Sequence, residues 1–119
     1  MDINQKITEL SGIVDCPVSQ DIYEGEKNRY ITFSYEDERP VMYGDNKPKE
    51  DIAYLQISYY VPVTYSYMKD KHKIRDFLEN SGFKVTSIRC WTEDALTGYQ
   101  KVRHLLFEVN YTENRRKEE

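Results

Sequence analysis

The sequence contains few cysteines, histidines, glycines and prolines, the residues on which disulfide-rich, metal-binding and low-complexity proteins depend. Its 119 residues include 2 Cys, 2 His, 5 Gly and 4 Pro. Cys16 and Cys90 are far apart and belong to no CxxC or Cys/His cluster. We therefore expect two buried thiols, and neither a disulfide framework nor a zinc site. No run of about 18 apolar residues is present, which argues against a membrane-spanning helix.

The charge balance is slightly acidic. Lys and Arg number 17 and Asp and Glu number 21, giving a net charge of −4. A dedicated nucleic-acid binder would need a basic patch, so specific nucleic-acid binding is not expected. The first ten residues, MDINQKITEL, lack a basic region followed by an apolar stretch. We expect no signal peptide and a protein that stays inside the cell that makes it.

The composition predicts one globular domain. A chain of this length, with 39% hydrophobic and 32% charged residues, has enough apolar side chains for one core. We assign residues 1–113 to a single domain and expect the charged residues 114–119 to fray. Tyrosine is unusually frequent, with 11 Tyr against 4 Phe and 1 Trp. Half-buried strands explain most of these tyrosines, and an assembly surface explains the remainder.

Two segments carry a helical pattern. Asp2 and Gln5 predict a capping box at the start of the first helix, and Gly12 is expected to end it. The second helix is predicted from about Ser66 to Ser81, with Gly82 as its left-handed cap. Its charged side chains are expected to face solvent; they are Lys69, Asp70, Lys73, Arg75, Asp76 and Glu79.

Alternation with period two predicts five strands, over residues 18–23, 30–36, 52–63, 83–91 and 99–112. The first two are expected to form a hairpin around residues 24–29. A phase slip near Thr86 predicts a bulge in the fourth strand. In the third and fifth strands one parity is apolar and is expected to be buried; it comprises Ala53, Leu55, Ile57, Tyr59, Val61 and Val63, and then Leu105, Phe107, Val109 and Tyr111.

These elements predict an α+β fold of order α-β-β-β-α-β-β. The expected architecture is a mostly antiparallel sheet of four to five strands with two helices packed on one face.

Residues 37–51 are rich in charge and turn-forming residues and are predicted to be a long loop. Its apolar triplet Val41-Met42-Tyr43 either docks on another protein or folds against its own domain. Tyr54 and Tyr60 lie on the polar parity of the third strand. We take Val41, Met42, Tyr43, Tyr54 and Tyr60 as the candidate interface.

No arrangement of residues indicates catalysis. His72 lies among lysines on a helix and is expected to be solvated, and His104 is expected to make a cross-strand hydrogen bond. Nucleophile elbows, phosphate-binding glycine loops and metal-binding helix motifs are absent from the sequence. Asp45 with Glu50 or Asp51 gives only a weak metal pattern. We therefore expect no catalytic residue, no cofactor and no metal.

Four segments carry a resemblance to a known family. They are Tyr30-Ile31-Thr32-Phe33, Tyr54-Leu55-Gln56-Ile57, the helix ending in Gly82-Phe83, and the strand from Lys101 to Val109. Together they resemble a family of small proteins from phages of Gram-positive bacteria, similar to the tail terminator (tail completion) proteins of long-tailed phages. The resemblance spans about residues 16–111 and rests on structural strands.

The resemblance implies a virion structural protein with a helix-backed sheet that assembles as a homo-oligomeric ring, hexameric in the better-known members. Such a ring caps the tail tube and joins it to the head connector. It implies residence in the cytoplasm of the bacterial host during assembly, then in the virion tail or neck. The alternative is a small monomeric or dimeric prophage or bacterial domain that binds a protein through its Tyr-rich sheet. A remote third interpretation is a hydrolase.

Overall fold

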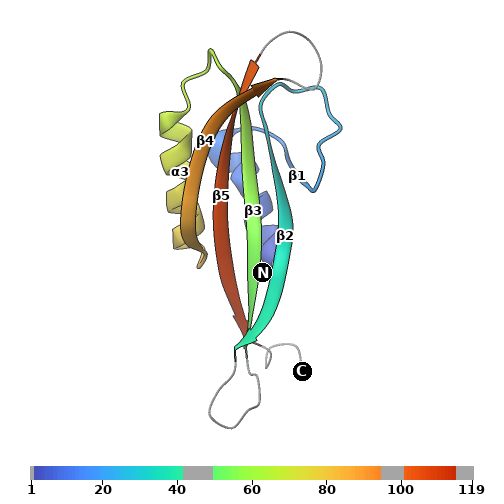
Figure 1. The fold of residues 1–119 in the computed structure, drawn as a ribbon, viewed down its shortest axis with the longest axis vertical. Helices are drawn as coiled ribbons and strands as arrows, with labels where there is room; N and C mark the ends of the chain where they lie inside the picture. Colours follow the sequence, from blue (N-terminus) through green and yellow to red (C-terminus); the bar gives the residue numbers. More distant parts are fainter. Residues whose placement is uncertain (1, 42–49, 95–100, 115–119) are drawn as a thin grey trace.

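The computed structural model describes residues 2–41, 50–94 and 101–114. Within these ranges the chain forms three helices and five strands (Figure 1). In chain order they are α1 (Ile3–Thr8), α2 (Leu10–Val14), β1 (Val18–Gln20), β2 (Tyr30–Val41), β3 (Glu50–Pro62), α3 (Met68–Asn80), β4 (Lys84–Asp94) and β5 (Lys101–Asn114). Helices α1 and α2 are joined through Glu9, whose backbone is also helical.

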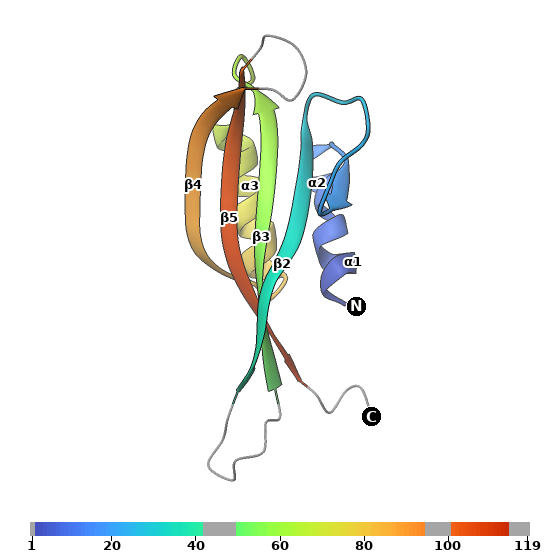
Figure 2. The same cartoon turned by 45° about the vertical axis from the view of Figure 1, so that its right-hand side comes forward.

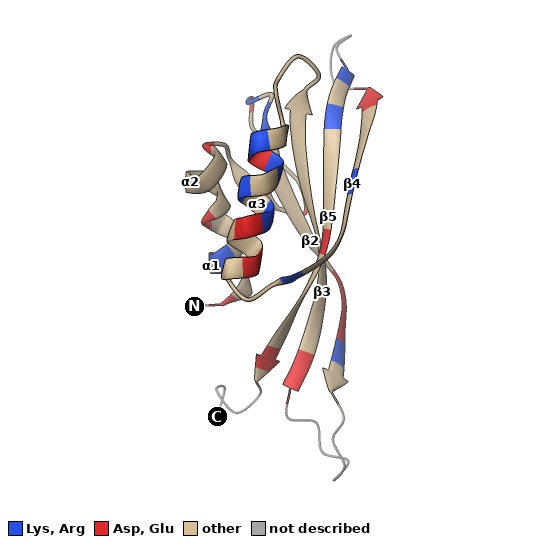
Figure 3. Cartoon of the chain, turned by 90° about the vertical axis from the view of Figure 1, so that its left-hand side faces the viewer, with Lys and Arg blue, Asp and Glu red and all other residues tan. Residues whose placement is uncertain are grey.

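The strands form one sheet in the order β1-β2-β3-β5-β4. Every neighbouring pair is antiparallel except β1 and β2. The helices lie on one face of this sheet, and no described segment of helix covers the other face, which we call the helix-free face (Figure 3). The predicted α+β class, with a mostly antiparallel sheet and helices on one face, is confirmed.

The core lies between the sheet and the helices. The apolar parity of β3 is buried from Ala53 to Val61, each residue being at most 1% exposed. Leu105, Phe107 and Val109 of β5 are buried beside it, as predicted. The helices contribute Ile7, Leu10, Ile74 and Leu78, all fully buried. Each fully buried side chain of this size contributes about 1.5–3 kcal/mol through the removal of apolar surface from water. Val63 departs from the prediction: it follows the end of β3 and is 40% exposed.

The predicted hairpin over residues 18–36 is wrong. Strand β1 has only three residues and runs parallel to β2. Asp21 donates its backbone N–H to the carbonyl of Phe33 at 2.8 Å, and its φ of 65° then turns the chain away from the strand. Alternation predicts that a segment is extended, but it contains no information on strand direction.

The predicted helix signals are partly confirmed. Asp2 and Gln5 form the capping box. Gly12, however, lies inside α2, and the helical segment ends at Asp15, whose φ is 52°. In the second helical region Gly82 has the expected left-handed φ of 96°, but α3 begins at Met68, later than predicted. None of the described helices is long and apolar enough to cross a membrane.

Residues 37–51 were predicted to be a loop, and much of this segment is strand instead. Strand β2 continues to Val41, β3 begins at Glu50, and these two residues are paired. Together with the end of β5, the two strands extend past the helices (Figure 2). We call this extension, residues 36–41, 50–54 and 110–114, the arm. It contributes to an elongated molecule with extents of 56 × 25 × 23 Å.

The ends of the last two strands also differ from the prediction. Strand β4 continues to Asp94, and β5 reaches Asn114, the first residue of the predicted frayed tail. The predicted bulge is confirmed, because the register of β4 against β5 shifts between Val85 and Ser87. Cys16 is buried as predicted, whereas Cys90 on the edge strand β4 is exposed.

Candidate interaction surface

Five aromatic rings form a stacked row across the helix-free face. Tyr30 of β2 is the register partner of Tyr60 of β3. Tyr60 and Trp91 are in turn the partners of His104 in β5. Tyr23, which precedes β2, stacks on Tyr30, and neighbouring ring centroids along the series are 4.3 to 4.8 Å apart. We call these five residues the aromatic row.

Four rings of the aromatic row stack face to face, and the fifth, Trp91, is tilted against His104. From Tyr23 to His104 the interplanar angles are 24° to 30°, and the Trp91–His104 contact is tilted at 51°. Because each ring covers the face of the next, most of the exposed surface consists of ring edges. Trp91, at the end of the row, remains 38% exposed. A largely apolar band of this kind fits packing against a protein better than stacking of a nucleobase or a sugar.

Leu106 continues this apolar band toward the middle of the sheet. It lies on the helix-free face between its register partners Ser58 and Arg89, and is only 6% exposed. The surrounding side chains on this face are half-buried and polar; they include Thr32, Ser34, Gln56, Ser58 and Asn110. An apolar centre with a polar surround is the arrangement found in protein–protein interfaces.

His104 is the one buried titratable side chain of the row. Its Nδ1 lies 3.4 Å from the Glu93 carboxylate, which also accepts a hydrogen bond from Trp91 Nε1 at 2.9 Å. The Nε2 atom is buried and has no hydrogen-bond partner among the described residues. Burial lowers the pKa of His104 below its usual value, although the Glu93 carboxylate acts in the opposite direction. His104 was expected to make a cross-strand hydrogen bond, and its partner across the strands is Glu93.

The lowered pKa of His104 predicts how stability depends on pH. A histidine in an unfolded chain has a pKa near 6.5, higher than that of His104 in the folded protein. As the pH falls through about 6.5, the unfolded chain therefore binds more protons than the folded chain. Acidification over this range lowers the free energy of unfolding. His104→Phe keeps the stacked ring and removes the titration. We expect the free energy of unfolding, measured by urea denaturation, to fall less in this variant than in the wild type between about pH 7.5 and 5.5. An equal fall in both proteins would contradict the assignment.

The structure separates the predicted interface residues. Tyr60 lies at the centre of the aromatic row, whereas Tyr54 lies on the same face but in the arm, with the Arg39 guanidinium 5.7 Å from its ring centroid. Val41 is half-buried at the end of β2. Met42 and Tyr43 lie outside the described residues. Sequence reasoning missed the other members of the row, because only the strand register brings Tyr23, Tyr30, Trp91 and His104 together.

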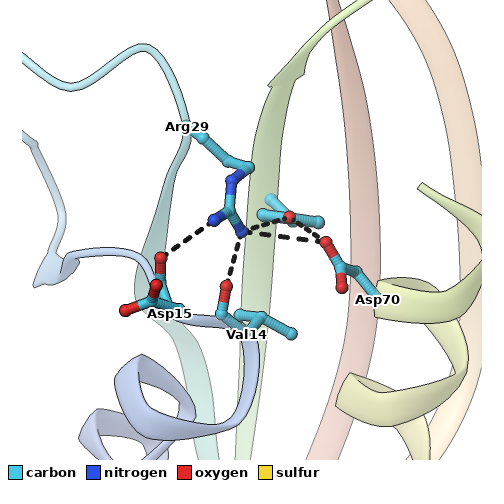
Figure 4. A network of polar contacts seen from close by, with 5 residues as sticks. Val14, Asp15, Arg29 and Asp70 are labelled. Carbon is cyan, nitrogen blue, oxygen red and sulfur yellow. Dashed lines mark hydrogen bonds and ion pairs between the residues drawn. The ribbon is translucent and has the colours of Figure 1, made fainter. Parts of the chain in front are cut away.

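A second cluster of polar groups lies on the helix-covered side of the sheet (Figure 4). Arg29 donates to the carbonyl oxygens of Val14 and Asp15, at 2.5 and 2.9 Å, and to Tyr59 Oη at 3.0 Å. Tyr59 in turn donates to Asp70 Oδ2 at 2.5 Å, and Arg29 Nη1 lies 3.7 Å from the same oxygen. We call Arg29, Tyr59 and Asp70 the clasp.

The clasp corrects one prediction. Asp70 was expected on the solvated side of α3, yet it is 7% exposed and faces Tyr59, which is fully buried. Burial and the hydrogen bond to Asp70 raise the pKa of Tyr59, so its hydroxyl stays protonated. Burial also raises the pKa of the Cys16 thiol to about 11. The clasp connects the end of α2, the centre of β3 and the first turn of α3, and this is a structural role.

Within residues 2–41, 50–94 and 101–114, no group of three His, Cys, Asp or Glu side chains is placed to hold a metal ion. His72 is exposed on α3, as predicted. Comparison of the sequence with protein-family models and with curated proteins gives no match. The geometry of the aromatic row is therefore the main guide to function.

Proposed function

We propose that this chain is a non-enzymatic structural protein that works by binding other copies of itself and neighbouring proteins, as a tail terminator does. The aromatic row carries the proposal. It is an apolar band that crosses four strands, on a face that no described helix covers. Aromatic side chains supply a large contact area at a low cost in side-chain entropy, which is why they are frequent at the centres of interfaces.

In this proposal the copies form a closed ring, for which the family resemblance gives a hexamer. Closure requires two different surfaces to meet around the ring. The aromatic row is one such surface, and the arm is a second, because its strands extend past the helices (Figure 2). The ring would cap the end of the tail tube and contact the head connector. The protein would be in the host cytoplasm during assembly and in the virion neck afterwards.

A second candidate function uses the same face. The row is continuous from Tyr23 to Trp91, so a single partner protein can cover it without a second copy of this chain. The protein would then be a monomeric or dimeric protein-binding domain of a prophage or bacterium. The molar mass in solution distinguishes the two candidates, because the first predicts a ring-shaped oligomer and the second a monomer or dimer.

Replacing Tyr60 tests the ring. We expect the wild type to sediment as a closed, ring-shaped oligomer of fixed mass. Tyr60→Ser should not form this oligomer, because the substitution removes the aromatic side chain at the centre of the row. Loss of cross-strand aromatic pairs costs about 0.2–1 kcal/mol each, so the variant should stay folded. Tyr35→Ser is the matched control: Tyr35 is 42% exposed and contacts Asn4 on the helix-covered face. Absence of a ring in the wild type, or a ring in Tyr60→Ser, would contradict the proposal.

A further inference from the structure

Strand β4 forms one margin of the sheet, and its outer edge has no strand partner among the described residues (Figure 2). Natural sheets protect such edges with charged side chains, prolines, bulges or inward-pointing charges, and of these the end of β4 carries only charged side chains. The bulge of β4 lies near its start, between Val85 and Ser87. From Ile88 to Asp94 the strand is in continuous register with β5 and contains no proline. These seven residues form a regular edge that is open to another strand.

The side chains along this edge are complementary to themselves. Arg89, Trp91 and Glu93 point to the helix-free face, because their partners in β5 all have even numbers, as does His104. Arg89 precedes Trp91 by two residues and Glu93 follows it by two. If two copies of the edge pair antiparallel about Trp91, each Arg89 lies opposite the Glu93 of the other copy. Opposite charges facing each other across strands are stabilising, and like charges are destabilising.

We infer that β4 pairs with β4 of a second copy, antiparallel and centred on Trp91. The twofold axis then runs through the sheet, the helices of both copies stay on one face, and the two aromatic rows meet at their exposed Trp91 ends. An isologous contact of this kind contains each interaction twice. The contact shares Trp91 with the aromatic row but is formed by the β4 edge, and it does not depend on the proposed ring.

Existing contacts leave both charges available to a second copy. Arg89 already pairs with Glu108 at 2.6 Å, yet its side chain is 58% exposed. Glu93 contacts Trp91 and His104, and its side chain is 39% exposed. Each carboxylate has two oxygens and the guanidinium has five donors, so an intermolecular pair adds to these contacts without replacing them.

Charge reversal tests the pairing, and the Tyr60→Ser background removes any contribution of the ring contact. In that background we expect a concentration-dependent dimer by sedimentation equilibrium. Arg89→Glu and Glu93→Arg each place two like-charged pairs in the dimer, and each should raise the dissociation constant about tenfold or more. An equimolar mixture of the two single variants places opposite charges at both pairs again. It should form a heterodimer with a dissociation constant within about threefold of the parent's.

The mixture controls for damage within one chain. Each variant loses the same intramolecular contacts alone and in the mixture, so recovery only on mixing reports the contact between copies. A monomeric parent at all concentrations, or no heterodimer on mixing, would overturn the inference. Neither result bears on the ring, which is measured with the Tyr60 side chain intact.

Discussion

Replacing Arg29 by methionine should lower the free energy of unfolding by up to about 3–5 kcal/mol, the cost of removing one partner of a buried ion pair; the Arg29 side chain is 20% exposed and that of Asp70 10%. Methionine keeps the apolar stem but leaves the Asp70 carboxylate with Tyr59 as its only clasp partner. The carbonyl oxygens of Val14 and Asp15 also lose their side-chain donor. The measurement is the midpoint and slope of urea denaturation. A domain of this size has about 5–15 kcal/mol of total stability, so the variant should unfold at much lower denaturant concentration.

Two further variants show whether the loss comes from the unpaired carboxylate. Arg39→Met is the matched control, because Arg39 pairs with Asp37 at the surface and such pairs contribute about 0–1 kcal/mol. Adding Asp70→Asn to Arg29→Met removes the buried charge and should recover part of the lost stability. A cost of less than about 1 kcal/mol for Arg29→Met would show that the clasp is not an energetic link between the helices.

Replacing Phe107 by alanine should cost about 3–5 kcal/mol, through lost burial of the ring and the cavity left behind. Phe107 is fully buried in β5, between its register partners Ile57 and Ile88. Leu55→Ala, at another fully buried position, should cost about 2–5 kcal/mol.

Urea denaturation measures both core variants, with Ile22→Ala as the control. Ile22 is 66% exposed, so its truncation should change stability by less than about 0.5 kcal/mol. Similar small effects at Phe107 and Ile22 would show that the apolar parity of β5 is not the core of the sheet.

Features set by local sequence were predicted well. The alternation from Ala53 to Val61 identified the buried parity of β3, because successive side chains of a strand point to opposite faces. The capping box at Asp2 and Gln5 and the left-handed Gly82 were predicted for the same reason. Each depends on residues within one turn or one strand, so the sequence contains the whole signal.

Features set by contacts between distant segments were missed. Asp70 has the charge and spacing of a solvent-facing helix residue, and only its contacts with Tyr59 and Arg29 explain its burial. The same holds for the aromatic row, whose members come from four strands and the segment before β2. Strand length was underestimated around residues 37–51 because Pro40 and the charges there are typical of loops, although an edge strand tolerates both.

The pairing of β3 with β5 at the centre of the sheet has a consequence for how the chain folds. The register places Ile57 against Phe107 and Tyr60 against His104, with α3 and β4 in the sequence between them. Closing so large a loop costs chain entropy before any contact offsets it. Sheets dominated by such distant pairings fold in about milliseconds to seconds, more slowly than helical bundles. During synthesis β2 and β3 leave the ribosome before β5, so one edge of β3 stays unpaired until β5 has emerged as well.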